Sequence, residues 1–185
     1  MGPASDPMAV VDARPIVEWD AYDGRIAAID SVELRPRVTG YLAGVHFREG
    51  SEVEKGALLF TVDDREYRAA LASAQANTAR AQTRVEVART EFARSEKLKA
   101  ARAVSEEELE TRRGELRQAE ADVKAAEAQQ RQAELNVEFT RIRAPIAGSV
   151  SSAAVRPGNL VVAGNTVLTT VVSADPVYVE FQGDE

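Results

Sequence analysis

A long stretch without turn-forming residues constrains this sequence most. Between Ala57 and Ala144 there is no proline, and Gly114 is the only glycine. Alanine, glutamate, glutamine and arginine fill most of the stretch, and all four are good helix formers. The absence of turn signals therefore predicts helix over most of residues 64–139, with one interruption near residues 101–104.

Two narrow stripes follow the helical period on either side of that interruption. Before it, residues alternately three and four apart form one stripe: Leu71, Ala74, Thr78, Ala81, Val85, Ala88, Phe92 and Ser95. After it, the same spacing recurs at Leu109, Arg112, Leu116, Ala119, Val123, Ala126, Gln130, Ala133 and Val137. Two such seams joined by a short connection favour a second helix that folds back along the first as an antiparallel coiled coil. We predict a helical hairpin over residues 64–140, with helices at about 64–100 and 105–139 and a first helix roughly 55 Å long.

Charge and composition exclude several classes of function. The formal net charge is −7, and no basic cluster with interleaved aromatic residues is present, which argues against nucleic-acid binding. The chain has no cysteine, so a disulfide or a zinc–thiolate site cannot form. Its carboxylates are not accompanied by a catalytic histidine, a cysteine or a glycine-rich phosphate loop. We therefore expect no catalytic residues, no cofactor and no metal site.

The start of the chain carries no recognisable targeting signal. Residues 1–13 are predicted to be a disordered leader, because Met1 to Met8 contain two prolines together with Gly2 and Ser5 and look unlike a native beginning. No apolar run approaches the roughly eighteen residues that span a bilayer. The polypeptide as given is therefore expected to be soluble.

The segments that flank the hairpin repeat each other. Three glycines recur at an offset of 108 residues, Gly40, Gly50 and Gly56 matching Gly148, Gly158 and Gly164. Apolar pairs keep the same offset: Val38 and Ile146, Leu42 and Val150, Phe47 and Val155, Val53 and Val161, Leu59 and Val167, Phe60 and Leu168. A repeat in one register without a gap indicates two related β halves, 34–63 and 141–173. Each half is too small for its own core, so we expect the two to pack together with these glycines at their turns.

Strand-like residues also occupy both ends of the chain. Ile16, Trp19 and Tyr22 precede an Asp23-Gly24 turn signal, and apolar residues follow it, which predicts short strands within 14–33. At the other end, apolar residues alternate with Tyr178 and Glu180, which predicts a strand within 174–185. The only partner available to that strand is the segment 15–34.

A β half, a long helical hairpin and a matching β half resemble the periplasmic adaptor proteins, or membrane fusion proteins, of tripartite efflux pumps. The stretches LRPRVTGYLAGVHFREGSEVEKGALLFTVD (34–63) and FTRIRAPIAGSVSSAAVRPGNLVVAGNTVLTTVV (139–172) match the pattern of that family. ADPVYVEF (174–181) resembles its entry into the adaptor β-barrel. The resemblance implies an α+β fold: a coiled-coil hairpin inserted between two halves of a lipoyl/biotinyl-like β-sandwich, with partial β-barrel strands at both ends.

The hairpin tip carries a sharper resemblance. Adaptors of the resistance-nodulation-division (RND) branch have an arginine, a leucine four residues later and a serine seven further on, associated with docking to a TolC-type outer-membrane channel. The segment RSEKLKAARAVS supplies Arg94, Leu98 and Ser105 at those spacings. By resemblance, these three residues are the partner-binding residues.

Each tip residue also has a structural interpretation. Ser105 begins a Ser-Glu-Glu-Glu capping box, in which its hydroxyl accepts a backbone hydrogen bond and Glu108 reaches back. Leu98 could close the end of the seam, and Arg94 could be a solvated charge. Asp63 to Glu66 predicts a second capping box, at the start of the first helix.

Two isolated residues also need an interpretation. Gly114 costs about 1 kcal/mol relative to alanine inside a helix, so it either permits close approach of a neighbouring helix or is simply tolerated. His46, the only histidine, is expected to be structural, since one histidine makes neither a triad nor a metal site.

The resemblance implies a non-enzymatic adaptor that links an inner-membrane RND drug/proton antiporter to a TolC-type channel in multidrug efflux. It further implies a periplasmic location, attachment to the inner membrane through an N-terminal anchor, and a homo-oligomer in the pump. The 185 residues alone are expected to form a monomer or weak dimer. Alternatives are an adaptor of an ATP-driven exporter or of a type I secretion system, and a lipoyl or biotin carrier. The carrier lacks support, because no lysine lies between Ala57 and Glu96 to hold a cofactor.

Overall fold

The computed structural model describes residues 17, 24–174 and 177–181. The expected leader 1–13 and the expected strand residues Ile16, Trp19 and Tyr22 lie outside these ranges. The helices and strands in chain order are β1 Gly24–Ala28, β2 Ser31–Leu34, β3 Gly40–Val45, β4 Glu52–Val53, β5 Leu58–Val62, α1 Arg65–Ala100, α2 Glu106–Phe139, β6 Arg141–Arg143, β7 Gly148–Val150, β8 Leu160–Val161, β9 Thr169–Val172 and β10 Val177–Phe181.

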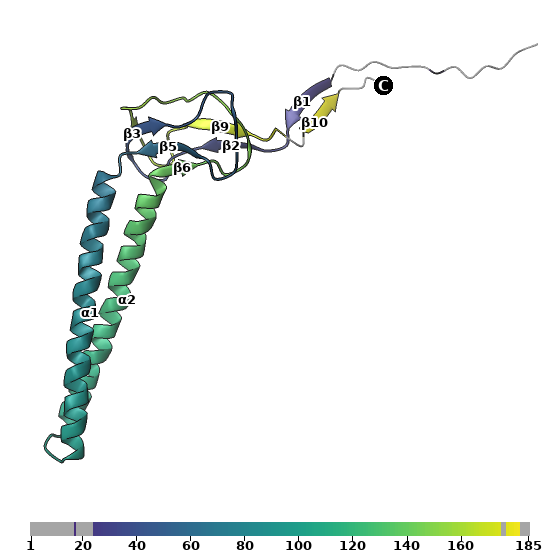
Figure 1. The fold of residues 1–185 in the computed structure, drawn as a ribbon. Coiled ribbons are helices and arrows are strands. Elements are labelled where there is room, and N and C mark those ends of the chain that lie inside the picture. The colour runs from purple at the N-terminus through teal and green to yellow at the C-terminus, as the bar shows by residue number, and fades with distance from the viewer. Residues whose placement is uncertain (1–16, 18–23, 175–176, 182–185) are drawn as a thin grey trace, which may run out of the picture.

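A long hairpin projects from one end of a small sandwich of strands (Figure 1). The two four-stranded sheets have the orders β2-β9-β7-β4 and β6-β5-β3-β8. Each sheet takes two strands from the segment before the hairpin and two from the segment after it. The predicted fold class, a hairpin inserted between two halves of a β-sandwich, is confirmed.

The sequence repeat relates one sheet to the other. With the 108-residue offset, β2, β3, β4 and β5 correspond approximately to β6, β7, β8 and β9. If each strand of one sheet is replaced by its counterpart, the strand order of the other sheet results. The backbone hydrogen bonds follow the same relation. Gly158 N donates to Leu42 O at 2.8 Å, and Gly50 N donates to Val150 O at 2.9 Å. The two halves are thus interleaved, and neither half can form a sheet of this kind without the other.

Two of the three glycine pairs form matching turns in the two halves. Gly40 and Gly148, which were also expected at turns, instead open the strands β3 and β7. Gly50 and Gly158 have φ of 76° and 91°, and Gly56 and Gly164 have φ of 87° and 71°. Residues with a Cβ rarely adopt this conformation. Gly56 N donates to Ala144 O and Gly164 N donates to Pro36 O, both at 2.8 Å. Each of these turns is therefore hydrogen-bonded to the other half of the repeat.

Two arginines at equivalent positions of the repeat also form hydrogen bonds between the halves. Arg35 Nη1 donates to Gly164 O at 3.2 Å, and Arg143 Nη1 donates to Gly56 O at 2.8 Å. Arg35 and Arg143 occupy equivalent positions of the repeat, and so do the glycines that accept from them. Both guanidinium groups therefore hold the turn of the opposite half in place.

The core lies between the two sheets. Its buried side chains are apolar: Leu34, Leu42, Leu59, Phe60, Val62, Ile142, Ala144, Val150, Ala153, Val161, Leu168 and Val171. Phe60 is fully buried and packs edge to face against Phe47, with 5.2 Å between the ring centroids. Several pairs predicted from the repeat, such as Leu42 with Val150 and Phe60 with Leu168, lie together in this core.

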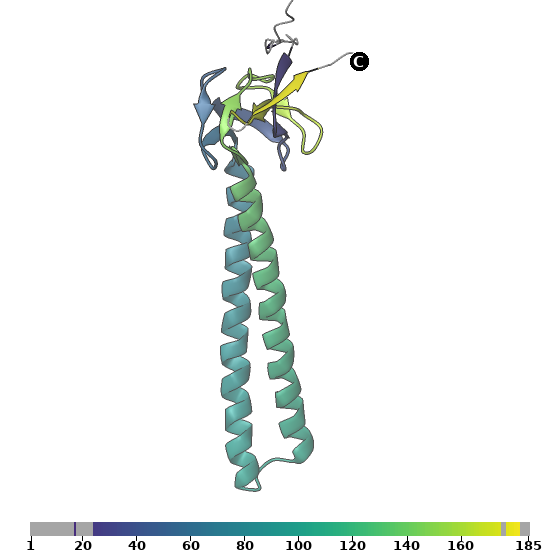
Figure 2. The same ribbon diagram turned by 90° about the vertical axis from the view of Figure 1, so that its right-hand side faces the viewer.

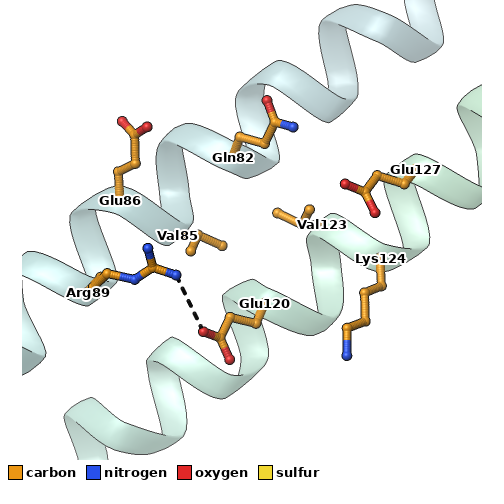
Figure 3. A pocket seen from close by; sticks show the side chains of 8 residues that line it. All are labelled: Gln82, Val85, Glu86, Arg89, Glu120, Val123, Lys124 and Glu127. Atoms are coloured by element: carbon orange, nitrogen blue, oxygen red, sulfur yellow. Dashed lines mark ion pairs between the residues drawn. The ribbon is translucent and has the colours of Figure 1, made fainter.

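The hairpin helices run side by side from the sandwich to the tip (Figure 2). Every residue predicted for the two seams is buried or half-buried, so the antiparallel packing inferred from the spacing is confirmed. Val85 and Val123 lie between the helices, and Arg89 pairs with Glu120 at 3.7 Å on one flank (Figure 3). Exposed pairs of this kind contribute little stability.

The base of α1 corrects one prediction. The expected capping box from Asp63 to Glu66 is absent: α1 begins at Arg65, and its N-cap, Asp64, makes no side-chain capping hydrogen bond. Asp63 instead accepts from the backbone N of Arg65 at 3.2 Å and from its Nε at 2.9 Å. The arginine directly after the cap competes for the carboxylate that the box requires.

We expect the carboxyl group of Asp63 to have an unusually low pKa. The hydrogen bond from the Arg65 side chain, assisted by that from its backbone N, lowers the pKa of Asp63 from 3.8 to about 2. Because the folded state has the lower pKa, the stabilisation from this contact is complete above pH 3.8 and is lost as the pH falls toward 2. A carboxyl carbon NMR titration should show this midpoint, and Arg65→Gln should raise it. A midpoint near 3.8 in the unchanged chain would contradict the contact.

The first and last strands of the described chain form a separate pair. β1 pairs antiparallel with β10, with Ile26 opposite Val179, so the partner expected for the final strand is the one observed. β2, in contrast, pairs with β9 of the sandwich. The expected barrel segment 14–33 therefore includes Ser31 to Glu33, which belong to the sandwich instead. Strand-like composition alone could not divide β1 from β2, because both mix apolar residues with one charged residue.

Candidate functional site

The hairpin tip lies farthest from the sandwich and presents the predicted partner-binding residues. Arg94 and Leu98 are one turn apart near the end of α1, a spacing that places both on one face of the helix. Arg94 is exposed, and the Leu98 side chain is 40% exposed. Leu98 therefore does not close the seam, which ends near the tip with the buried Ser95 and Leu109.

A short turn joins the two helices. Ala101 N donates to Lys97 O at 3.2 Å, Arg102 N to Lys99 O at 2.9 Å and Ala103 N to Leu98 O at 2.8 Å. These bonds satisfy carbonyl groups that would otherwise lack partners at the end of α1. The backbone around Leu98 is thus fixed by the turn that follows it.

Ser105 caps α2. Its Oγ accepts a hydrogen bond from Glu108 N at 3.2 Å, which is half of the predicted capping box. The Glu108 carboxylate does not complete the box, because it accepts from Arg112 Nε at 3.0 Å. Ser105 is exposed, so capping still leaves its side chain open to a partner.

Replacing Ser105 with alanine should fray the first turn of α2. Loss of an N-cap serine costs about 1 kcal/mol, and the amide of Glu108 should then exchange its hydrogen faster. Ser105→Asp should restore protection, since aspartate also caps. Hydrogen exchange read at Glu108 checks this directly. Unchanged protection in Ser105→Ala would mean that the cap does not hold this turn.

An ionic network links the two helices just below the tip. Arg112 Nη1 lies 3.3 Å from Glu91 of α1 and 3.0 Å from Glu115, while its Nε contacts Glu108. These carboxylates, Glu115 first, raise the pKa of Arg112. Arg112 occupies a seam position, so this polar residue links both helices instead of interrupting their packing.

A further ion pair bridges the tip itself. Lys99 of α1 pairs with Glu106 of α2, and the hydrogen bond from Lys99 lowers the pKa of the Glu106 carboxyl. The pair was not foreseen, because sequence spacing alone does not show which residues meet across a turn. It ties the end of α1 to the start of α2.

The other residues singled out in the sequence lie away from the tip. A Cβ at Gly114 would meet nothing within 4 Å, so no contact among the described residues requires glycine there. His46 is exposed, and its Nε2 lies 3.0 Å from Thr61 Oγ1. Within the described ranges, no cluster of three or more His, Cys, Asp or Glu side chains could hold a metal ion. No helix there is long and apolar enough to cross a membrane.

A split β-sandwich with a projecting coiled-coil hairpin is the architecture of the membrane fusion proteins. The family described as RND MFP, barrel-sandwich hybrid domain, matches residues 30–173. This chain therefore belongs to the RND membrane fusion protein family.

Two curated relatives agree with this family. The multidrug efflux pump subunit AcrA of Escherichia coli (strain K12) is 33% identical over 174 residues, which are 94% of this chain and 44% of AcrA. The multidrug resistance protein MdtA of Yersinia pestis (strain Pestoides F) is 34% identical over 186 residues, covering 97% of this chain and 42% of MdtA. The chain thus spans less than half the length of these relatives.

Solved structures show the same fold. A MacA-MexA chimeric protein containing the Pseudomonas aeruginosa MexA α-hairpin domain has a TM-score of 0.67 and 29% identity, covering 88% of this chain and 53% of the chimera. The membrane fusion protein Spr0693 from Streptococcus pneumoniae has a TM-score of 0.66 and 21% identity, covering 84% of this chain and 67% of its own. At that identity, the second likeness concerns the fold alone.

Proposed function

We propose that this chain is part of a periplasmic adaptor that links an inner-membrane RND drug/proton antiporter to a TolC-type outer-membrane channel. The curated relatives are named as multidrug efflux and resistance proteins. Like them, the complete protein would act in multidrug efflux. It would be attached to the inner membrane through an N-terminal anchor and would assemble as a homo-oligomer in the pump.

The observation that carries this proposal is the placement of Arg94, Leu98 and Ser105 at the far end of a rigid rod. At 1.5 Å per residue, the 36 residues of α1 extend roughly 54 Å. A leucine that is 40% exposed at the end of such a rod is available to an apolar site on a partner. The arginine can add a directional hydrogen bond to backbone or carboxylate oxygens, and Ser105 can add another from the start of α2.

The adaptor carries no chemistry of its own in this proposal. A lipoyl or biotin carrier needs a lysine at the turn between its two halves, where the swinging cofactor is attached. Here β5 and β6 pair directly, with Leu58 opposite Arg143, and the hairpin occupies the place of that turn. We therefore assign no cofactor, and intact mass of protein from cells would reveal an added lipoyl or biotinyl group if this is wrong.

The 185-residue chain by itself should be a monomer or a weak dimer. Its principal seam is already filled by the two helices of the same hairpin. Sedimentation of the purified chain at micromolar concentration checks this state. A stable closed ring would contradict it.

Deletion of the gene tests the proposed function. Cells without the complete protein should become sensitive to several chemically unrelated compounds, and expression of the complete protein should restore resistance. Co-purification should recover a large inner-membrane transporter together with the channel. Recovery of an ATP-driven transporter instead would favour the alternative adaptor class, and unchanged resistance would oppose the proposal.

A further inference from the structure

One residue of the hairpin turn has a backbone conformation that side chains rarely adopt. Arg102 has a φ of 58°, and within residues 17, 24–174 and 177–181 no other non-glycine residue has a positive φ. It directly follows the last turn of α1, where helices commonly end with glycine or asparagine. In every residue except glycine, this conformation brings Cβ close to the following carbonyl oxygen, so the arginine is held there at a cost.

The Arg102 side chain makes no hydrogen bond or ion pair that would stabilise the turn among the described residues. The hydrogen bonds of the turn, from Arg102 N to Lys99 O and from Ala103 N to Leu98 O, join backbone atoms only. In the described part of the chain, the guanidinium makes no ion pair. Lys97 and Lys99 already place positive charge in the last turn of α1, where it complements the helix dipole. A glycine at position 102 would therefore satisfy the fold better.

The charge of the tip differs from that of the shaft. From Lys97 to Ser105 the sequence carries three cations and no carboxylate, whereas three glutamates, Glu106 to Glu108, follow at the start of α2 and the shaft carries residues of both signs. One of these cations, Lys99, is paired with Glu106. Arg102 thus supplies positive charge at the turn, between the exposed Leu98 and Ser105.

We propose that Arg102 is a further docking residue, which binds a carboxylate of the outer-membrane channel beside the apolar site that takes Leu98. This inference rests on the proposed function. Strained residues that the fold does not need are found preferentially at functional sites. The guanidinium is suited to this role, because its planar fork can form two parallel hydrogen bonds with one carboxylate.

Substitutions at position 102 separate docking from folding. In the complete protein, Arg102→Gly and Arg102→Asn remove the charge but tolerate the left-handed conformation. Both should bind the purified TolC-type channel at least about tenfold more weakly, since tenfold is the loss expected for a single charge-assisted hydrogen bond. Hydrogen exchange at the Ala103 amide should be unchanged or slower. Arg131→Gln, which removes an exposed arginine from the shaft of α2, is the matched control and should bind normally.

Two results would overturn the assignment. Unchanged channel binding by both variants would remove Arg102 from the interface. Weaker binding accompanied by faster exchange at Ala103 would mean that the arginine acts through the fold of the turn. Leu98→Asp in the same assay separates this inference from the proposed function. If Leu98→Asp and both Arg102 variants all bind normally, the proposal that the tip docks to the channel is wrong. If Leu98→Asp binds weakly while both Arg102 variants bind normally, only the role of Arg102 is rejected.

Discussion

Replacing Gly148 with alanine should destabilise the sandwich more than a substitution at any of the turn glycines with φ near 70–90°. Gly148 opens β7, and its φ is 156°. A Cβ there would lie 2.0 Å from Val172 O and 2.8 Å from Val172 C, both backbone atoms of the neighbouring strand β9. Backbone atoms cannot rotate away as a side chain can, so β9 would have to separate from β7. We expect a loss of roughly 3 to 5 kcal/mol, a large part of the stability of a typical domain.

The repeat supplies matched controls for this prediction. At Gly40, the equivalent position, the nearest contact of an added Cβ is Val62 Cγ1 at 2.7 Å, a side-chain atom that can move. At Gly158 nothing lies within 4 Å, and alanine should cost only the roughly 1–2 kcal/mol of the left-handed conformation. Urea unfolding followed by circular dichroism should rank the losses Gly148 above Gly40 above Gly158. Equal midpoints for Gly148→Ala and Gly158→Ala would show that the close approach of β7 and β9 is not limiting.

Leu98→Asp should strongly weaken binding to the outer-membrane channel without unfolding the hairpin. The leucine is exposed, so aspartate fits the free protein, but in the docked state it would place a charge where an apolar contact is proposed. Truncation of a central interface residue typically costs 2 kcal/mol or more, and a buried unpaired carboxylate adds to this. We therefore expect at least about a thirtyfold loss of affinity, together with loss of resistance in cells.

Leu135 provides a control of nearly identical exposure. It is 38% exposed on α2 near the sandwich, at the opposite end of the rod from Leu98. Both substitutions remove nearly the same exposed apolar surface from the free chain. Because Leu135 lies far from the tip, Leu135→Asp should bind the channel within about twofold of the unchanged protein. Arg94→Ala should show an intermediate loss. Equal effects of Leu98→Asp and Leu135→Asp would point to a general effect on the hairpin.

The periodic parts of the fold could be predicted from the sequence. The seams were visible because a coiled coil repeats one packing environment along its length, which forces small or apolar residues at regular spacing. The two halves were visible because turns such as those at Gly56 and Gly164 require the same backbone conformation in each. The sequence did not show that the halves exchange strands between the sheets, because strand order depends on hydrogen bonds between segments far apart in the chain.

Local competition for hydrogen bonds explains the details that were missed. At the base of α1, Arg65 takes the Asp63 carboxylate that a capping box would have used. At the tip, Glu108 is shared with Arg112, so the box at Ser105 forms only in part. The left-handed conformation of Arg102 could not be predicted from the sequence. Such a conformation is inferred from glycine or asparagine, and neither is present in the turn.

Photo-cross-linking from the hairpin tip in living cells tests the central claim most directly. A photoreactive amino acid would replace Leu98 in the complete protein, and a matched variant would carry it at Leu135. If the tip docks to the channel, irradiation should join position 98 to the TolC-type outer-membrane protein, and position 135 should give no such product. A channel adduct from position 135, or none from position 98 while the pump still confers resistance, would contradict docking through the tip.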